Sequence, residues 1–465
     1  MSIKTTKVSQ AHSRTWLVLT NQNSPGPCGQ GFKTILMKTI PLLILTILVW
    51  SCDTPTETVV DPQDYDDYLT YLTNVSPDAT TEEIRFWSER LHQNSQDEVA
   101  VLKLAGLFSG RFKISGEIRD IKVSDSLYHS VLKTYASSSV DIYHCLATNA
   151  ITQHKFQLAK EYVEKAIKLK DKRAASLLIL VDVSLEVGDY ATARRTLQQF
   201  RNKNSFAYLI REAKLKDHEG DLEGAISSME RAYHRIEGNK GLSQWALCNL
   251  ADMYGHAGRI SEAYQLYLET LRINPHDDYA LKGIAWIAFS KDFNSTEAKR
   301  IINTLASRKK MPETNLLLAE IAAFENDENE KLAQLKQFKS FVSQPAYKNM
   351  YHRYLAIIEA EDFANADESV AIAKIEIENR PTPQSFDLLA WGLYHQGNFS
   401  QALEVARQKV EGQNFEPEAY YHLGQIYLAN GNHLKSKQYL EEALKSEFEL
   451  GPTIVRQILE TLRTI

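Results

Sequence analysis

The sequence predicts an all-α protein built from a row of similar helical hairpins. From about residue 81 onwards, apolar residues recur every three or four positions, which is the period of a helix with one buried face. No convincing alternation of apolar and polar residues, the period of a strand, interrupts this pattern. A motif of small and aromatic residues also returns in register along the chain, as in an array of repeated units.

The composition is that of a globular protein and excludes several classes of function. Hydrophobic residues make up 43% of the 465 residues, and the 20 Gly and 13 Pro are too few for a collagen-like or Pro-rich chain. Acidic residues outnumber basic ones by 59 to 53. This balance argues against a general nucleic-acid binder, because such a protein needs clustered Lys and Arg to neutralise phosphates.

The N-terminal region is predicted to direct the chain to its cellular location rather than to form part of the fold. Residues 37–51 start at Met37, continue as an apolar run and end just before Cys52. The run is too short to span a bilayer and is typical of a secretory signal peptide. Together with Cys52 it resembles a bacterial lipoprotein signal, which implies acylation of Cys52 and a lipid anchor in the cell envelope. Residues 1–36 precede the expected start of that signal, and we interpret them as an over-extended N-terminus.

Residues 52–80 are predicted to form a solvated acidic tether. After Cys52 the segment reads DTPTETVVDPQDYDDY, and this mixture of Pro, Thr and Asp favours a polar linker. Its aspartates lack the spacing, the Gly and the distal Glu of an EF-hand, so calcium binding is the less favoured interpretation. The first 51 residues carry five basic and no acidic side chains. A chain without them would be held at a membrane by acyl chains and not by a basic patch.

Six segments share the spacing of one helical repeat. The clearest copy has, in order, Leu250, Ala251, Tyr254, Gly258, Ala263, Tyr267 and Pro275. The last copy has Leu423, Gly424, Tyr427 and Gly431, and the copy 34 residues before it has Leu389, Ala390, Leu393 and Gly397. Three further copies are centred on Leu146, Leu180 and Leu209. The small residues let two helices approach closely, and the turn Gly allows a left-handed backbone.

This pattern resembles the tetratricopeptide repeat family. The resemblance covers residues 141–275 and 381–465, and it implies an α-solenoid, a right-handed superhelix of about ten helical hairpins with a concave inner face. Residues 81–140 are expected to form atypical N-terminal helical hairpins, with a long insert between Phe108 and Asp125. Residues 276–380 are expected to be degenerate repeats, with first helices at 280–289, 314–324 and 351–360. A last helix at 453–464 would cap the array.

The sequence contains no motif that indicates an enzyme. Metalloprotease, serine-hydrolase, P-loop and dinucleotide-binding signatures are absent, as are Cys-x-x-Cys pairs. Cys145 and Cys248 lie in separate repeats, so no disulfide is expected between them. His218, His256 and His395 occupy the same place in three repeats, but the copies are too far apart for joint metal ligation, so polar groove residues are the favoured interpretation. We expect a non-catalytic chain without cofactor or metal.

In tetratricopeptide proteins the first helix of each hairpin lines the concave groove. The resemblance places eleven residues of this chain there, namely Lys214, Asp217, Trp245, Asp252, His256, Asp387, Trp391, Tyr394, His395, Tyr421 and Gln425. Aromatic side chains with polar neighbours suit recognition of a peptide or a helix. For Trp245 and Trp391, packing between hairpins is an open alternative. Asp217 and Asp252 would repel a peptide carboxylate, which argues against a chaperone-type carboxylate clamp.

Two functional hypotheses follow. The first is a membrane-anchored, non-catalytic protein–protein interaction scaffold of the bacterial cell envelope, with a protein or peptide ligand in the concave groove and no nucleic acid. The second is a glycan-capturing outer-membrane lipoprotein of a nutrient uptake system, which such a chain resembles in anchor and aromatic content. Those lipoproteins interrupt their repeats with long non-helical excursions, whereas these repeats run nearly back to back. The first hypothesis is therefore favoured, with the periplasmic face and the cell surface both open as locations.

Overall fold

The computed structural model describes residues 58–70, 79–134, 139–170, 172–236, 238–308, 311–345 and 347–465. Within these ranges all regular secondary structure is helical and no strand is present, which confirms the all-α fold class. The predicted over-extension 1–36, the signal peptide 37–51 and the lipid attachment at Cys52 lie outside the described residues. In the described ranges, no helix has both the length and the apolar character that crossing a bilayer requires.

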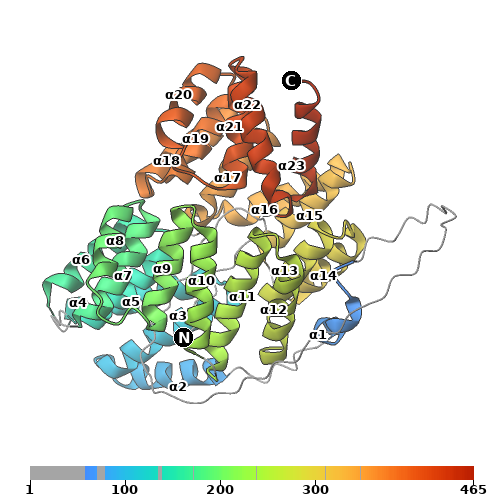
Figure 1. Cartoon of the computed structure of the whole chain (residues 1–465). Helices are drawn as coiled ribbons and strands as arrows, with labels where there is room; N and C mark the ends of the chain where they lie inside the picture. The colour runs from blue at the N-terminus through green and yellow to red at the C-terminus, as the bar shows by residue number, and fades with distance from the viewer. Residues whose placement is uncertain are drawn as a thin grey trace, which may run out of the picture.

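The helices follow one another with short connections (Figure 1). Their bounds are η1 Pro62–Asp64, α1 Asp66–Thr70, α2 Ala79–Gln93, α3 Glu98–Ser115, α4 Ile118–Thr134, α5 Val140–Thr152, α6 Phe156–Lys168, α7 Arg173–Glu186, α8 Tyr190–Gln198, α9 Phe206–His218, α10 Leu222–His234, α11 Lys240–His256, α12 Ile260–Ile273, α13 Asp278–Ser290, α14 Ser295–Arg308, α15 Pro312–Phe324, α16 Glu328–Val342, η2 Lys348–Tyr351, α17 His352–Glu361, α18 Ala366–Asn379, α19 Pro383–His395, α20 Phe399–Lys409, α21 Pro417–Ala429, α22 His433–Ala443, η3 Leu444–Ser446 and α23 Glu447–Leu462.

Consecutive helices pair into hairpins, and the hairpins stack in chain order. Among the described residues, ten such pairs run from α3 with α4 to α21 with α22, which confirms the predicted number. The α9/α10 pair illustrates the packing, because Ala213 and Ala225 are fully buried and let the two helices approach. The helices α13, α15 and α17 lie where the sequence predicts first helices in residues 276–380. The degenerate region therefore continues the same solenoid.

The predicted long insert between Phe108 and Asp125 is wrong. Helix α3 continues to Ser115, Gly116 ends it in the left-handed conformation (φ 73°), and α4 begins at Ile118. The first half of α3 packs into one apolar cluster with α4–α7, whereas Phe112 packs into another with α15–α19. Because α3 is buried on two faces, its C-terminal half lacks the one-sided apolar pattern by which a helix is recognised in a sequence.

The solenoid winds back on itself, so that hairpins about six units apart along the chain touch. Asn379, at the end of α18, accepts a hydrogen bond from the Phe156 backbone N–H (3.1 Å) and donates one to the His154 carbonyl (2.7 Å). Arg380 pairs with Glu186 at the end of α7 (3.5 Å). In Figure 1 the C-terminal hairpins accordingly lie directly above the N-terminal ones. These contacts close one turn of the superhelix into a ring.

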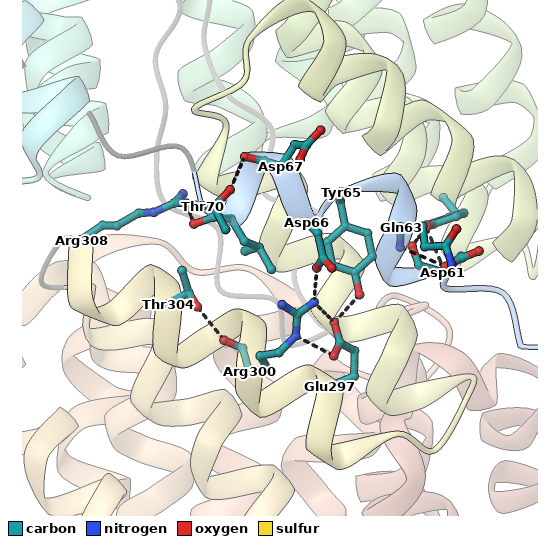
Figure 2. Close-up of polar contacts among 12 residues, drawn as sticks. Asp61, Gln63, Tyr65, Asp66, Asp67, Thr70, Glu297, Arg300, Thr304 and Arg308 are labelled. Atoms are coloured by element: carbon teal, nitrogen blue, oxygen red, sulfur yellow. Dashed lines mark hydrogen bonds and ion pairs between the residues drawn. The ribbon is translucent and has the colours of Figure 1, made fainter. Parts of the chain in front are cut away.

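Residues 58–70, here called the N-terminal strap, correct the prediction of a solvated tether. Val60, Tyr65 and Leu69 are buried in the apolar cluster formed by α11 to α15. The Tyr65 hydroxyl donates to Glu297 of α14, and Arg300 of the same helix bonds Asp66 (2.6 Å), as Figure 2 shows. The apolar residues through which the strap binds lie between aspartates and Pro, so the overall composition of the segment indicated a polar linker.

Helix α23 does more than cap the array as predicted. Leu450 and Ile458 do form an apolar cluster with Leu440 and Ala443 of the last hairpin. However, the helix contains a break at Gly451 (φ 78°, ψ 161°), and its first turn enters the concave side. There it contacts α11, α13 and α15, all first helices of their hairpins. The C-terminal helix therefore covers part of the groove that the resemblance assigned to a ligand.

Candidate functional site

The predicted groove residues of the N-terminal half are engaged inside the protein. Trp245 is buried and packs edge-on against Phe206 at a centroid distance of 6.0 Å. Asp252 accepts hydrogen bonds from the hydroxyls of Tyr267 (2.6 Å) and Tyr279. The contacts with Phe206 and Tyr279 join neighbouring hairpins, and the one with Tyr267 lies within a hairpin. The packing alternative therefore holds for Trp245.

Three ionisable groove candidates of that half also have interaction partners within the chain. Lys214 donates to Glu186 (2.5 Å), and both side chains are buried. Burial alone would raise the pKa of Glu186, but the positive charges of Lys214 and Arg380 lower it to about 2. Asp217 is buried in α9, and His256 Nδ1 lies 3.1 Å from Glu449 of α23. In this half the candidates at concave positions contact neighbouring hairpins or α23.

The C-terminal candidates meet around one cavity of about 520 Å³. Trp391, Tyr394 and His395 of α19 form one side, and Tyr421 and Gln425 of α21 form the next. The remaining walls come from α15, α16, α17 and α23. The carboxyl groups on these walls belong to Glu320, Glu361, Asp362, Glu418 and Glu460, and Lys331 provides the ammonium group. Asp387 lies behind the wall, where it bonds His422 (2.9 Å).

Trp391 supports the wall of this cavity rather than offering a free ring face. It is 3% exposed and lies between Tyr394, at a centroid distance of 4.8 Å and nearly parallel, and His422, at 4.0 Å. Its indole N–H donates to Glu361 (2.7 Å). Both faces of the indole are therefore covered, and its polar edge positions a carboxyl group of the cavity.

Glu361 is the residue of this cavity that the sequence analysis missed. Glu361 is the last residue of α17, as His395 is the last residue of α19. This shared position could have identified Glu361 from the sequence, but α17 lies in the degenerate region, where the repeats are hard to align. The side chain is exposed and lines the cavity, where protein on several sides limits its contact with bulk water. Desolvation and the neighbouring charge of Asp362 raise the pKa of Glu361 to about 7. Desolvation, with a smaller effect of His422, lowers the pKa of His395 to about 4.

Helix α23 lies across the cavity and shares its side chains. The Tyr421 hydroxyl donates to Gln457 (3.0 Å), and Gln425 donates to Thr461 (3.3 Å). A ligand of the cavity would therefore contact α23 as well as the repeats. In the part of the chain that the structure describes, no three His, Cys, Asp or Glu side chains are grouped closely enough to hold a metal ion, and His218, His256 and His395 do not meet.

Family models described as "Tetratricopeptide repeat" match residues 384–408 and 417–449, which correspond to the hairpins α19/α20 and α21/α22. These two hairpins are tetratricopeptide repeats. Repeats of this family bind proteins and peptides, so the chain's general class is a protein-interaction scaffold. The cavity lies on the two hairpins that the family models match. A search of curated proteins found no match.

Several solved structures are similar to this chain. A tetratricopeptide repeat protein from Parabacteroides merdae is 18% identical, covers 55% of this chain and 97% of its own, and has a TM-score of 0.33. Pseudomonas aeruginosa pilF is 15% identical over 45% of this chain and 96% of its own, with a TM-score of 0.34. YrrB, described as a tetratricopeptide protein with an unusual peptide-binding site, is 18% identical over 42% and 95%, with a TM-score of 0.26.

Proposed function

We propose that this protein is a non-catalytic interaction scaffold of the bacterial cell envelope, anchored in a membrane through acylated Cys52. The observation that carries the proposal is the cavity at α19 and α21, where five predicted groove residues meet. Tyr394, His395, Tyr421 and Gln425 give it aromatic and polar walls. A partner protein inserts a side chain or a short segment there, against the repeats and α23.

The charge of the cavity favours a basic group on the partner. Five carboxyl groups and one ammonium group line it; Lys331 is already paired with Asp362 (2.6 Å), and Glu418 is paired with Arg353 behind the wall. Glu361 accepts a hydrogen bond from the uncharged Trp391 indole and lies near His422, and a further cation would stabilise its ionised form. A Lys or Arg of the partner would supply that cation, and the tyrosine rings beside it would add cation–π contacts.

The glycan-capturing alternative has less support. Sugar sites need an aromatic ring face that can lie flat against the sugar, and both faces of Trp391 are covered. The cavity is also built from helices rather than from loops between them. A protein partner therefore remains the favoured ligand class.

The proposal is tested with a photo-crosslinking amino acid at position 394 in cells that carry the protein in their membranes. Tyr394 lines the cavity, whereas Leu434, 71% exposed on α22, lies outside it and serves as the matched control position. We expect a specific protein to be crosslinked from position 394 and not from position 434. With that partner purified, Glu361→Lys should weaken binding about tenfold or more, since about 1.4 kcal/mol is lost for each tenfold. Equal crosslinking from both positions, or a partner unaffected by Glu361→Lys, would contradict the proposal.

A further inference from the structure

The N-terminal strap fixes the point at which the chain leaves the solenoid. The two oxygens of Asp292 accept the backbone N–H groups of Val59 (3.0 Å) and Val60 (2.9 Å). Tyr264 of α12 accepts the Asp61 N–H (3.1 Å). At the other end of the strap, Arg308 donates to the carbonyls of Tyr68 and Leu69. The start of the strap is thereby bonded to the α13–α14 turn, residues 291–294.

The covalent chain limits how far this turn can lie from a lipid anchor at Cys52. Only five residues separate Cys52 from Thr58, where the described strap begins. Even a fully extended chain spans at most about 3.6 Å per residue, which gives about 20 Å for this distance. An acylated Cys52 lies at the membrane surface, so the α13–α14 turn must lie close to that surface as well.

The turn itself presents an aromatic side chain outwards. Phe293 is 62% exposed, and its backbone is in the left-handed region (φ 53°), which is rare for a bulky residue. Exposure of a large apolar ring is unfavourable in water, and the Phe293 ring stacks only loosely on that of Phe324, at a centroid distance of 6.4 Å. Other hairpin turns hold a left-handed residue at the same place, such as His154, Asn326 and Ala364, so this backbone belongs to the turn. The feature particular to this turn is the large apolar ring that it exposes. Aromatic side chains are favoured at the boundary between lipid headgroups and acyl chains.

The charges around the turn favour insertion of an apolar ring over attraction to anionic lipid. Lys291 is exposed on the turn, but Asp61 and Asp64 of the strap, whose start is bonded to that turn, are exposed as well. These carboxylates would offset the attraction of one lysine. Membrane contact here should therefore depend little on the anionic lipid content.

We infer that the α13–α14 turn is the membrane-facing surface of the anchored protein, with Phe293 inserted at the lipid interface. This inference rests on the acylation of Cys52 in the proposed function. The anchor supplies the affinity, and the strap with Phe293 sets the orientation. The hairpins α19–α22 lie away from the strap, as Figure 1 shows. The α15 and α23 wall of the cavity lies closer to the turn, because Phe293 stacks on Phe324, which follows the cavity residue Ala323.

The orientation can be tested with an environment-sensitive fluorophore on Phe293→Cys, in acylated protein reconstituted into phosphatidylcholine vesicles. The matched control is Leu434→Cys, an exposed apolar position on α22, and Cys145 and Cys248 are replaced by Ala in both chains. Quenching by lipids with a shallow acyl-chain quencher should be several-fold stronger at 293 than at 434, with or without phosphatidylglycerol. Asp292→Ala, which removes both bonds to the strap, should reduce quenching at 293 while the protein stays on the vesicles.

Equal quenching at the two positions, or none at 293, would overturn the inference. Failure of the anchor is recognised separately, by mass spectrometry of Cys52 and by loss of vesicle flotation. In that case the same labelled chains, made with Cys52→Ser and a synthetic acyl group on the residue 52 amine, still test the orientation. Quenching that appears only with phosphatidylglycerol would also contradict the inference, because it would indicate a charge-driven surface.

Discussion

Glu361 shows how the closed solenoid changes the chemistry of a single side chain. Its carboxyl group faces a water-accessible cavity, yet the surrounding protein and Asp362 raise its pKa to about 7. The ordinary value for Glu is about 4.3, so the neutral form is favoured by folding. The contribution of this group to stability is therefore fully present below about pH 4.5 and is lost as the pH rises through 7.

The substitution Glu361→Gln tests this linkage. Glutamine keeps an acceptor for the Trp391 indole N–H but cannot ionise, so it removes the cost of placing a charge there. We expect the melting temperature of the variant to exceed that of the wild type at pH 8, and the difference to shrink steadily towards pH 5. Glu460→Gln, at an exposed position of the same cavity, controls for the loss of one carboxyl group. A difference that does not change between pH 5 and 8 would show that the Glu361 carboxyl group is not perturbed.

At the scale of elements, the loop between the two helices of a hairpin must reverse the chain direction. In some hairpins this loop also packs against a hairpin of the next superhelical turn. Gly220 ends α9 with φ 81°, and a Cβ atom there would lie 2.9 Å from the Phe415 ring, which precedes α21. Gly258 adopts a similar backbone conformation (φ 74°) between α11 and α12, but no atom lies within 4 Å of its Cβ position. The two glycines therefore separate the backbone requirement from close packing.

Alanine substitutions at these two turns should differ in cost. Gly258→Ala should lower the free energy of unfolding by about 1 kcal/mol, because only the left-handed backbone becomes unfavourable. Gly220→Ala should lower it by the same amount and by about 1–3 kcal/mol more, because Phe415 must also move. Urea unfolding of both variants would measure the two free energies of unfolding. Equal losses would indicate that Phe415 adjusts freely and that the contact between superhelical turns is loose at this point.

The difference between contacts within a repeat and contacts between distant hairpins explains which elements can be predicted from the sequence. Hairpin positions such as Ala213 and Ala225 depend on neighbours within one repeat, so the pattern of small residues identifies the helices even in residues 276–380. The strap and the start of α23 instead depend on distant partners, as in Tyr65 with Glu297 and Phe448 with Trp286. The local sequence has no periodic pattern for such contacts, so it predicts only a tether for the strap and only a cap for α23. Glu361 was missed for a related reason, because its surroundings come from several separate hairpins.

At the scale of the whole molecule, ring closure changes how a repeat protein should unfold. In an open solenoid each repeat contacts only its neighbours, so the two ends can unfold separately. Here Asn379 joins α18 to the α5–α6 turn through its side-chain oxygen and nitrogen. Arg380 and Tyr347 make further bonds to the N-terminal hairpins. These contacts couple the two halves, and a single cooperative transition is expected.

Replacing Asn379 with Ala should uncouple the halves. It removes two hydrogen bonds and leaves the Phe156 N–H and the His154 carbonyl without this partner, at a cost of about 1–3 kcal/mol. Asn315→Ala is the matched control, because Asn315 donates to Gln334 (2.6 Å) and Gln337 within the single hairpin α15/α16. Hydrogen exchange along a urea titration should show α5–α8 and α17–α20 opening together in the wild type and in Asn315→Ala. In Asn379→Ala the two regions should open at different urea concentrations. Coincident opening in all three proteins would mean that stacking between neighbouring hairpins, and not ring closure, makes the fold cooperative.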